Sequence, residues 1–182
     1  MNVLELVQKA AYVWNESADI ADNELFLNAP VDEVAILFSS EANLVRFARL
    51  ATEGGLEHFN SVKRDLMRRQ DTLEPEDFYV RFEFLRIPGA PWRIEAMCVL
   101  EGTAPLHEQH LAQHGNGSIV HASYKCEDID SYHHAVNVLR TEMGAGAPAV
   151  AFHAEYRNTY GIFSYWGEED YYFKPRVNLR DR

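Results

Sequence analysis

Polar and ionisable side chains recur two residues apart in segments that alternate between polar and apolar residues. The pairs are Arg81 with Glu83, Arg93 with Glu95, His121 with Ser123, His153 with Glu155, and Lys174 with Arg176. Successive side chains of a β-strand point to opposite faces, so the members of each pair share a face. Such a face is typical of a concave polar pocket or of a sheet that exposes one side to water, and the pattern fits both.

His153 and Glu155 are the candidates for catalysis. An imidazole and a carboxylate that stand two residues apart on one strand face can reach the same ion or the same proton. An ion pair between Glu155 and either Arg93 or Arg157 explains this carboxylate equally well.

Arg93, Ser123 and Trp92 are the candidates for substrate binding. Arg93 can anchor an anionic group, because a guanidinium binds carboxylates and phosphates in a planar, two-pronged manner. Ser123 shares a strand face with His121, and Trp92 can form an apolar wall beside the polar groups.

Three more histidines are closely spaced at His107, His110 and His114. A helix would place the first two on one face and the last two on one face, as metal ligands require. Gly115 and Gly117 interrupt such a helix, so we expect a long loop with one helical turn at most. Loops of this length often carry function, and both simple solvation and a contribution to a site stay open.

The elements that must position these residues follow from the spacing of the apolar side chains. Helices are expected over residues 3–14, from a cap at 39–41 to the glycines at 54–55, over 56–69, and from 128 to the glycines at 144–146. Strands are expected over residues 31–38, 78–87, 92–100, 118–126, 150–157, 162–166 and 171–176.

The composition favours one acidic globular domain. The chain has 182 residues, of which 47% are hydrophobic and 25% charged, and it carries a formal charge of −11. This charge repels phosphate backbones, so we expect no nucleic acid partner. No apolar run approaches the roughly 18 residues of a membrane helix, and the two cysteines fall in apolar segments, so we expect a cytoplasmic protein with no membrane partner.

The order of the expected elements resembles the vicinal oxygen chelate superfamily, which includes glyoxalases and extradiol dioxygenases, and more narrowly the YecM-like metal-binding proteins. The matching segments are Val31 to Ile36, the hairpin through Pro91-Trp92, and Leu106-His107-Glu108 ahead of Ile119-Val120-His121. The resemblance implies an α+β fold in which two βαβββ modules form an open, mainly antiparallel cup. The implied single domain of residues 1–182 has an N-terminal helical segment at 1–30, modules at 31–102 and 118–178, and a connecting loop at 103–117.

The resemblance also implies a divalent metal ion, Zn, Mn, Ni or Fe, with one ligand from the first and one from the last strand of each module. His121 fits the first strand of the second module. Glu33 stands where the family commonly has histidine, and Glu95 fits the last strand of the first module better than Glu101 does. The last strand of the second module offers Tyr172, Lys174 and Arg176, and none of these is an ordinary ligand. The fourth metal ligand is therefore not identified, and three explanations stay open: the chain binds no metal, a water molecule is the fourth ligand, or the chain belongs to a different family.

Two functions follow from these residues. The first is a metal-dependent enzyme of vicinal oxygen chelate type that acts on a small carbonyl or enediolate-forming substrate. The alternative is a non-catalytic module that binds a small ligand or a protein partner through the same cup. A homodimer is compatible with either function, because paired modules of this superfamily lie within one chain or between two chains.

Overall fold

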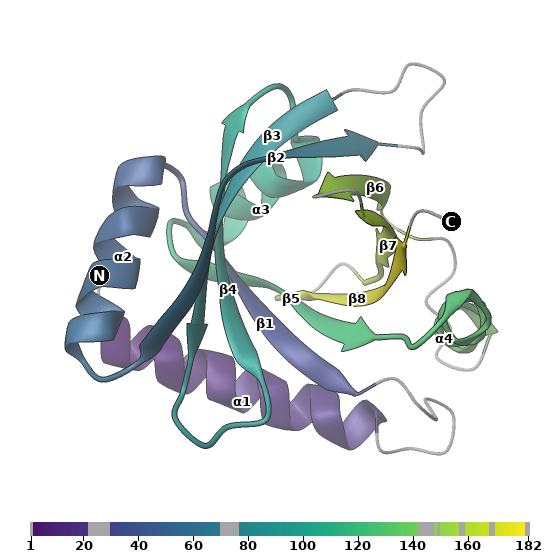
Figure 1. Ribbon diagram of the computed structural model, residues 1–182, viewed down its shortest axis with the longest axis horizontal. Coiled ribbons are helices and arrows are strands. Elements are labelled where there is room, and N and C mark those ends of the chain that lie inside the picture. Colours follow the sequence, from purple (N-terminus) through teal and green to yellow (C-terminus); the bar gives the residue numbers. More distant parts are fainter. Residues whose placement is uncertain are drawn as a thin grey trace.

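Figure 1 presents the computed structural model of the chain, which describes residues 2–21, 30–69, 77–141, 148, 150–156, 159–167 and 170–180. The elements are α1 (Val3–Ala21), β1 (Val31–Leu37), α2 (Glu41–Glu53), β2 (Glu57–Arg69), β3 (Asp77–Arg86), β4 (Arg93–Glu101), α3 (Pro105–His114), β5 (Ser118–Lys125), α4 (Ile129–Thr141), β6 (Val150–Tyr156), β7 (Thr159–Tyr165) and β8 (Tyr172–Arg180).

The eight strands form one closed ring in the order β1-β4-β3-β2-β6-β7-β8-β5. Within the first module β1 runs parallel to β4, and within the second β5 runs parallel to β8. The modules join where β1 pairs with β5 and where β2 pairs with β6, both antiparallel. The predicted α+β class and its two βαβββ modules are confirmed, with the sheet closed on itself around its axis (Figure 1).

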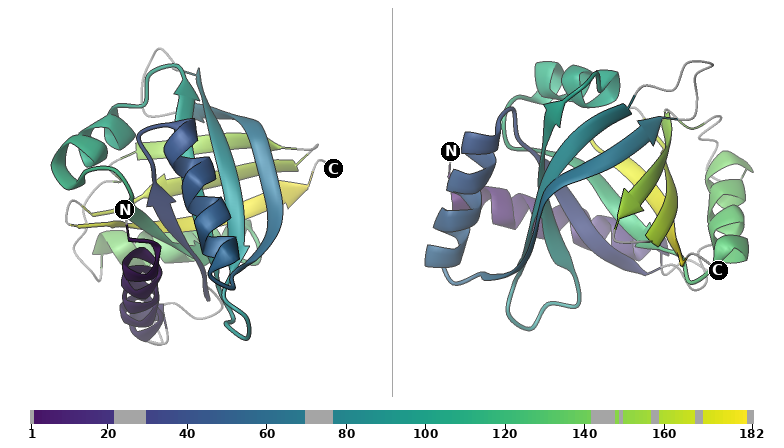
Figure 2. Two further views of the ribbon diagram at one scale, coloured as in Figure 1. Left: turned by 90° about the vertical axis from the view of Figure 1, so that its left-hand side faces the viewer. Right: turned by 45° about the horizontal axis from the view of Figure 1, so that its top comes forward.

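Two hydrophobic clusters lie on opposite sides of the strand ring. The outer cluster joins β1, β4 and β5 to helices α1, α2 and α4, and it contains Ile36, Phe47, Ile94 and Leu139. The inner cluster contains Leu37, Phe82, Met97 and Phe163. Strand alternation explains the division, because Ile36 and Leu37 are neighbours in β1 that point to opposite faces. Figures 1 and 2 show α1 and α2 on the outside of the ring next to β1 and β4.

Helix α2 illustrates how local sequence sets an element boundary. The Ser40 side chain accepts a hydrogen bond from the Asn43 amide at 3.3 Å, and Gly54 ends the helix. These are the cap residues that the sequence indicated. Among the described residues, no helix is long and apolar enough to cross a membrane.

Two predicted elements differ from the structure. Residues 56–69 were predicted as a helix, but Glu57–Arg69 is strand β2. A bulge between Val62 and Asp65 shifts the alternation of this strand by one residue, which hides its period from the sequence. Residues 105–114, predicted mainly as loop, form helix α3, with a proline in the first turn and Gly115 at its end.

Gly102, directly after β4, gives a test of the packing between the strand ends. It has φ +85°, and a Cβ there would lie 2.5 Å from the Asp77 carbonyl oxygen and 2.8 Å from Phe78 Cα. We expect Gly102→Ala to lower the free energy of unfolding by about 2 kcal/mol or more, because backbone must move as well as adopt a strained φ. Urea unfolding followed by circular dichroism measures this loss.

Gly89→Ala is the matched control, because Gly89 has φ +81° and open space around its Cβ position. This variant should lower the free energy of unfolding by only about 1 kcal/mol, because only the strained φ contributes. Equal losses in the two variants would contradict the close approach at Gly102.

Candidate metal centre

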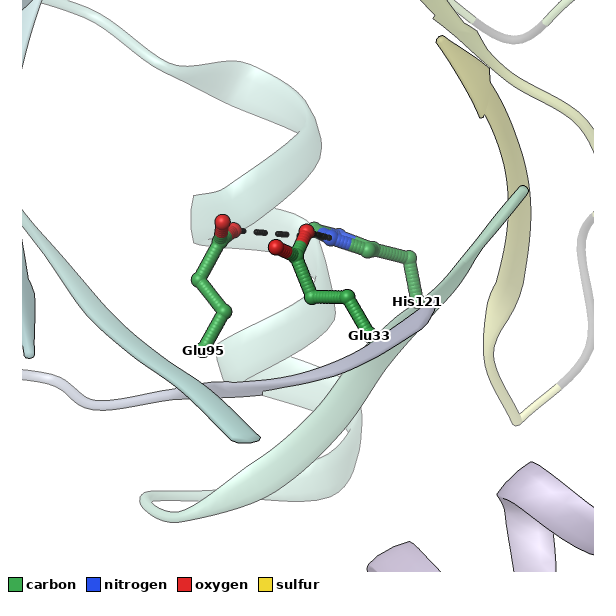
Figure 3. A group of neighbouring side chains, drawn as sticks. All are labelled: Glu33, Glu95 and His121. Atoms are coloured by element: carbon green, nitrogen blue, oxygen red, sulfur yellow. Dashed lines mark ion pairs between the residues drawn. The ribbon is translucent and has the colours of Figure 1, made fainter. Parts of the chain in front are cut away.

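Adjacent strands β4, β1, β5 and β8 each contribute a side chain to a group of four ionisable residues inside the ring. These are Glu95, Glu33, His121 and Lys174, and all four are buried. The register explains the convergence, because Ala35 of β1 stands opposite both Glu95 and His121. Glu33, Glu95 and His121 each offer a ligand atom within 4.8 Å of the others, and Figure 3 shows the three side chains pointing toward one another.

The spacing of these three groups fits a metal ion. His121 Nε2 lies 3.8 Å from Glu33 Oε1 and 3.5 Å from Glu95 Oε1. Donor atoms around a tetrahedral ion with bonds of about 2.1 Å lie roughly 3.4 Å apart. Both Oε1 atoms are buried and accept no hydrogen bond from any described residue, a costly state for a carboxylate that a bound cation relieves. The Glu-Glu-His group can therefore hold a metal ion.

Lys174 stands at the remaining corner. Its Nζ donates a hydrogen bond to His121 Nε2 at 3.0 Å and lies 3.6 Å from Oε1 of Glu33 and 3.6 Å from Oε1 of Glu95. The last strand of the second module thus supplies a cation where the resemblance implies a ligand.

Two arginines lie beside the other carboxylate oxygen of Glu33, Oε2. Arg93 Nε and one of its terminal nitrogens donate to Glu33 Oε2 at 2.9 and 2.6 Å. Arg176 donates to Asp32 at 2.6 Å and lies 3.8 Å from Glu33 Oε2. A register shift between Val31 and Glu33 allows the adjacent Asp32 and Glu33 to meet the same guanidinium.

These cations decide the ionisation of Glu33. Burial alone would raise the pKa of Glu33, but the positive charges of Arg176 and Lys174 outweigh it and hold this pKa well below its usual range. Burial, together with the negative charges of Glu95 and Glu33, raises the pKa of the Tyr165 phenol, whose ring centre lies 5.3 Å from that of His121. Glu33 is therefore an anion and Tyr165 a neutral phenol near neutral pH.

A cavity of about 270 Å³ opens beside the four groups. Its apolar walls come mainly from β2, β3 and β7, and the aromatic side chains among them are Phe59, Phe78, Phe82, Phe84, Phe163 and Tyr165. Its polar lining includes Glu33, Glu95, Lys174, Arg93, Arg176 and Asp65. The cavity is thus apolar along its sides and strongly ionic at one end.

The predicted substrate contacts have three different positions. Arg93 lines the cavity, although Glu33 occupies part of its guanidinium. Ser123 accepts a hydrogen bond from Arg176 Nε at 2.9 Å and is not among the cavity-lining residues described, so it supports that arginine. Trp92 stacks on Trp14 of α1, with ring centres 5.8 Å apart, in the outer cluster and away from the cavity lining.

Other predicted groups lie on the outer face of the ring or outside the described side chains. Arg81 and Glu83 pair with each other and with Glu41 and His58 on the outer face, so they do not share the face of Glu95. His153 and Glu155 lie in β6, and their side chains fall outside the described part of the structure.

Helix α3 divides the predicted histidine cluster. His107 and His110 are buried, whereas His114 is exposed. His107 lines the cavity, and its ring centre lies 5.9 Å from that of Tyr165. Burial, with smaller contributions from His121 and Lys174, lowers the pKa of His107 to about 3, so this imidazole is neutral at physiological pH.

The sequence did not assign a role to Asp65 or Lys174. Asp65 lies in the segment predicted as a helix, and the bulge in β2 turns its side chain into the cavity. Lys174 was identified as facing the cup, and its alternation with Arg176 is the signal that places both inside the barrel.

Fold and site together define a barrel of two βαβββ modules with an inward Glu-Glu-His group suited to a metal ion.

No protein-family model matches the chain, and no curated protein matches it. Solved structures of similar shape include a mutant of 4-hydroxymandelate synthase from Streptomyces coelicolor, with 13% identity, coverage of 85% of this chain and a TM-score of 0.48. Methylmalonyl-CoA epimerase from Mycobacterium tuberculosis has 17% identity, 84% coverage and a TM-score of 0.49.

A hypothetical protein from Bacillus halodurans is also similar, with 13% identity, 84% coverage and a TM-score of 0.46. The match covers 49% of the synthase chain, so this protein spans about half of it, against 88% of the epimerase and 96% of the hypothetical protein. Similarity at this level shows the fold and assigns no activity.

Asp65 gives a prediction about pH. Burial raises its pKa to about 6 from an ordinary 3.8, although the Leu66 amide opposes the shift. Because the folded protein binds more protons than the unfolded chain between these values, the stability that Asp65 contributes falls as pH rises through them. We expect Asp65→Asn to be more stabilising at pH 7 than at pH 4, as measured by urea unfolding at each pH.

Asp77→Asn is the matched control, because Asp77 is 47% exposed and pairs with Arg68 on the surface. This variant should show no gain in the free energy of unfolding at pH 7. An Asp65→Asn effect of the same size at both pH values would contradict a raised pKa.

Proposed function

We propose that this chain is a metal-dependent enzyme of the vicinal oxygen chelate type, acting on a small carbonyl or enediolate-forming substrate. The observation that carries the proposal is the convergence of Glu33, Glu95 and His121 within 4.8 Å of one another inside the barrel. The three side chains come from the strands on which that superfamily places its ligands. Their two carboxylates and one imidazole suit Zn, Mn, Ni or Fe alike.

The cavity supports a small organic substrate. Its aromatic walls suit an apolar body, and its ionic end suits a polar group of that molecule. Arg93, at the cavity wall, can bind an anionic group of the substrate with the part of its guanidinium that Glu33 leaves available.

A bound divalent ion would polarise a substrate oxygen and make the neighbouring carbon more acidic. The chain must then accept a proton from that carbon. Asp65 is a described carboxylate that lines the cavity, and its pKa of about 6 leaves it mostly ionised, and so able to act as a base, at neutral pH. The acid–base roles predicted for His153 and Glu155 stay predictions.

A non-catalytic binding module is the second candidate. The observation that favours it is Lys174, whose ammonium already lies beside Glu33 and Glu95 and can balance their negative charges without a metal ion. In that case the same cavity would bind a small ligand through its aromatic walls. A cytoplasmic location, the lack of a nucleic acid partner and a homodimer stay predictions under both functions.

Metal analysis tests the first function. We expect protein reconstituted with excess Zn, Mn, Ni or Fe, and then freed of unbound ions, to retain about one ion per chain of at least one of these metals. His121→Ala should retain less than about a tenth of that amount, because only two carboxylates remain as ligands. Inductively coupled plasma mass spectrometry measures both.

His133→Ala serves as the control, because His133 is exposed on α4, a helix that packs in the outer cluster and not inside the strand ring. It should retain the wild-type amount of metal. If the wild-type protein retains none of the four metals, the metalloenzyme proposal is wrong and the binding module is favoured.

A further inference from the structure

Lys174 contacts the three atoms that would bind a metal ion. Its Nζ lies 3.0 Å from His121 Nε2 and 3.6 Å from Oε1 of each glutamate. An ammonium has protons to donate and no lone pair, so His121 Nε2 accepts from it with the lone pair that a metal ion would use. The ammonium and a metal ion therefore need the same partners.

The charges around Glu33 and Glu95 are compensated without a metal ion. The carboxylates of Asp32, Glu33 and Glu95 face the cations of Arg93, Lys174 and Arg176, so three formal negative charges meet three positive ones. Asp65, which lines the same cavity, adds a fourth carboxylate near Glu95. A divalent ion added to these groups would leave an excess of positive charge at this end of the cavity. Such an excess is costly away from water, unless one resident cation withdraws.

Lys174 is the cation best able to withdraw. Arg93 and Arg176 are held by hydrogen bonds to the carboxylates of Glu33 and Asp32, whereas Lys174 makes its side-chain hydrogen bond, among the described residues, to the imidazole of His121, which carries no negative charge. Its stem is flexible, and the side chain lines the cavity. The Phe163 ring centre, 4.9 Å from Nζ, offers a surface that an ammonium can contact as it moves.

We infer that Lys174 is a built-in competitor of the metal ion, which balances Glu33 and Glu95 in the metal-free protein and withdraws into the cavity when an ion binds. The inference rests on the proposed function, because it assigns regulation to the same centre. The lysine keeps the metal-free barrel stable and lowers the affinity of the centre for metal.

Binding of Co²⁺ by Lys174→Met tests the inference. Methionine keeps much of the length of lysine and removes the charge. We expect this variant to bind Co²⁺ at least about tenfold more tightly than the wild type, because the ion no longer displaces an ammonium from two carboxylates. Visible absorption of the bound Co²⁺, in competition with a chelator of known affinity, gives both dissociation constants.

Lys63→Met is the matched control, because Lys63 is exposed on β2 and its loss changes the net charge equally. Its affinity for Co²⁺ should stay within about twofold of the wild type. In the absence of metal, Lys174→Met should melt at a lower temperature than Lys63→Met, and Co²⁺ should raise its melting temperature more than that of the wild type.

The outcomes separate this inference from the proposed function. Wild-type protein that binds Co²⁺ while Lys174→Met binds it equally or more weakly overturns the competition and leaves the metal centre standing. No Co²⁺ binding by either protein overturns the inference, and the retention of Zn, Mn, Ni or Fe then decides the proposed function separately. If Lys174→Met does not fold without metal, Lys174→Gln, which keeps a polar group, is measured in the same way and judged by the same tenfold criterion.

Discussion

The barrel depends on the mutual compensation of charges buried in its interior. Glu33 is 1% exposed and touches Arg93, Arg176, Lys174 and His121, which come from β4, β8 and β5. A buried carboxylate without such partners would cost several kcal/mol, and each cation would be equally costly alone. The cluster therefore fixes register, because a slip of one residue in any of these strands would turn a charge into the outer apolar cluster.

The inner cluster strengthens the interactions between these charges. Apolar and aromatic side chains such as Phe82 and Phe163 keep water from much of the cavity wall, and charges interact more strongly in such a medium. The strands that carry the ionic groups are also packed from outside, by α1 against β1 and β5 and by α2 against β4. Rigid support on both faces holds the side chains at fixed separations, which a metal centre requires.

The sequence predicted most of the fold and part of the centre. Alternation placed Glu95 with Arg93 on one face of β4, as the structure confirms, and the resemblance selected Glu33 and His121. Alternation failed for β2, because its bulge breaks the period and its many polar residues fit a solvated helix. It also cannot say which face is concave, so Trp92 was expected at a pocket and instead packs on Trp14 of the outer helix. Contacts between strands distant in the chain decide such questions.

The fourth position of the centre determines what kind of chemistry the barrel supports. Duplication of the module makes four inward positions equivalent by topology, on β1, β4, β5 and β8, whatever residues fill them. Three hold ordinary metal ligands, and the fourth holds Lys174, a cation on a flexible stem. A fourth carboxylate would commit the centre to a permanent ion, and an apolar residue would remove the cation that lies 3.6 Å from both Glu33 and Glu95. Lysine satisfies the charge in the absence of metal and can still yield its place, so the residue type, and not the fold, sets whether the centre depends on an ion.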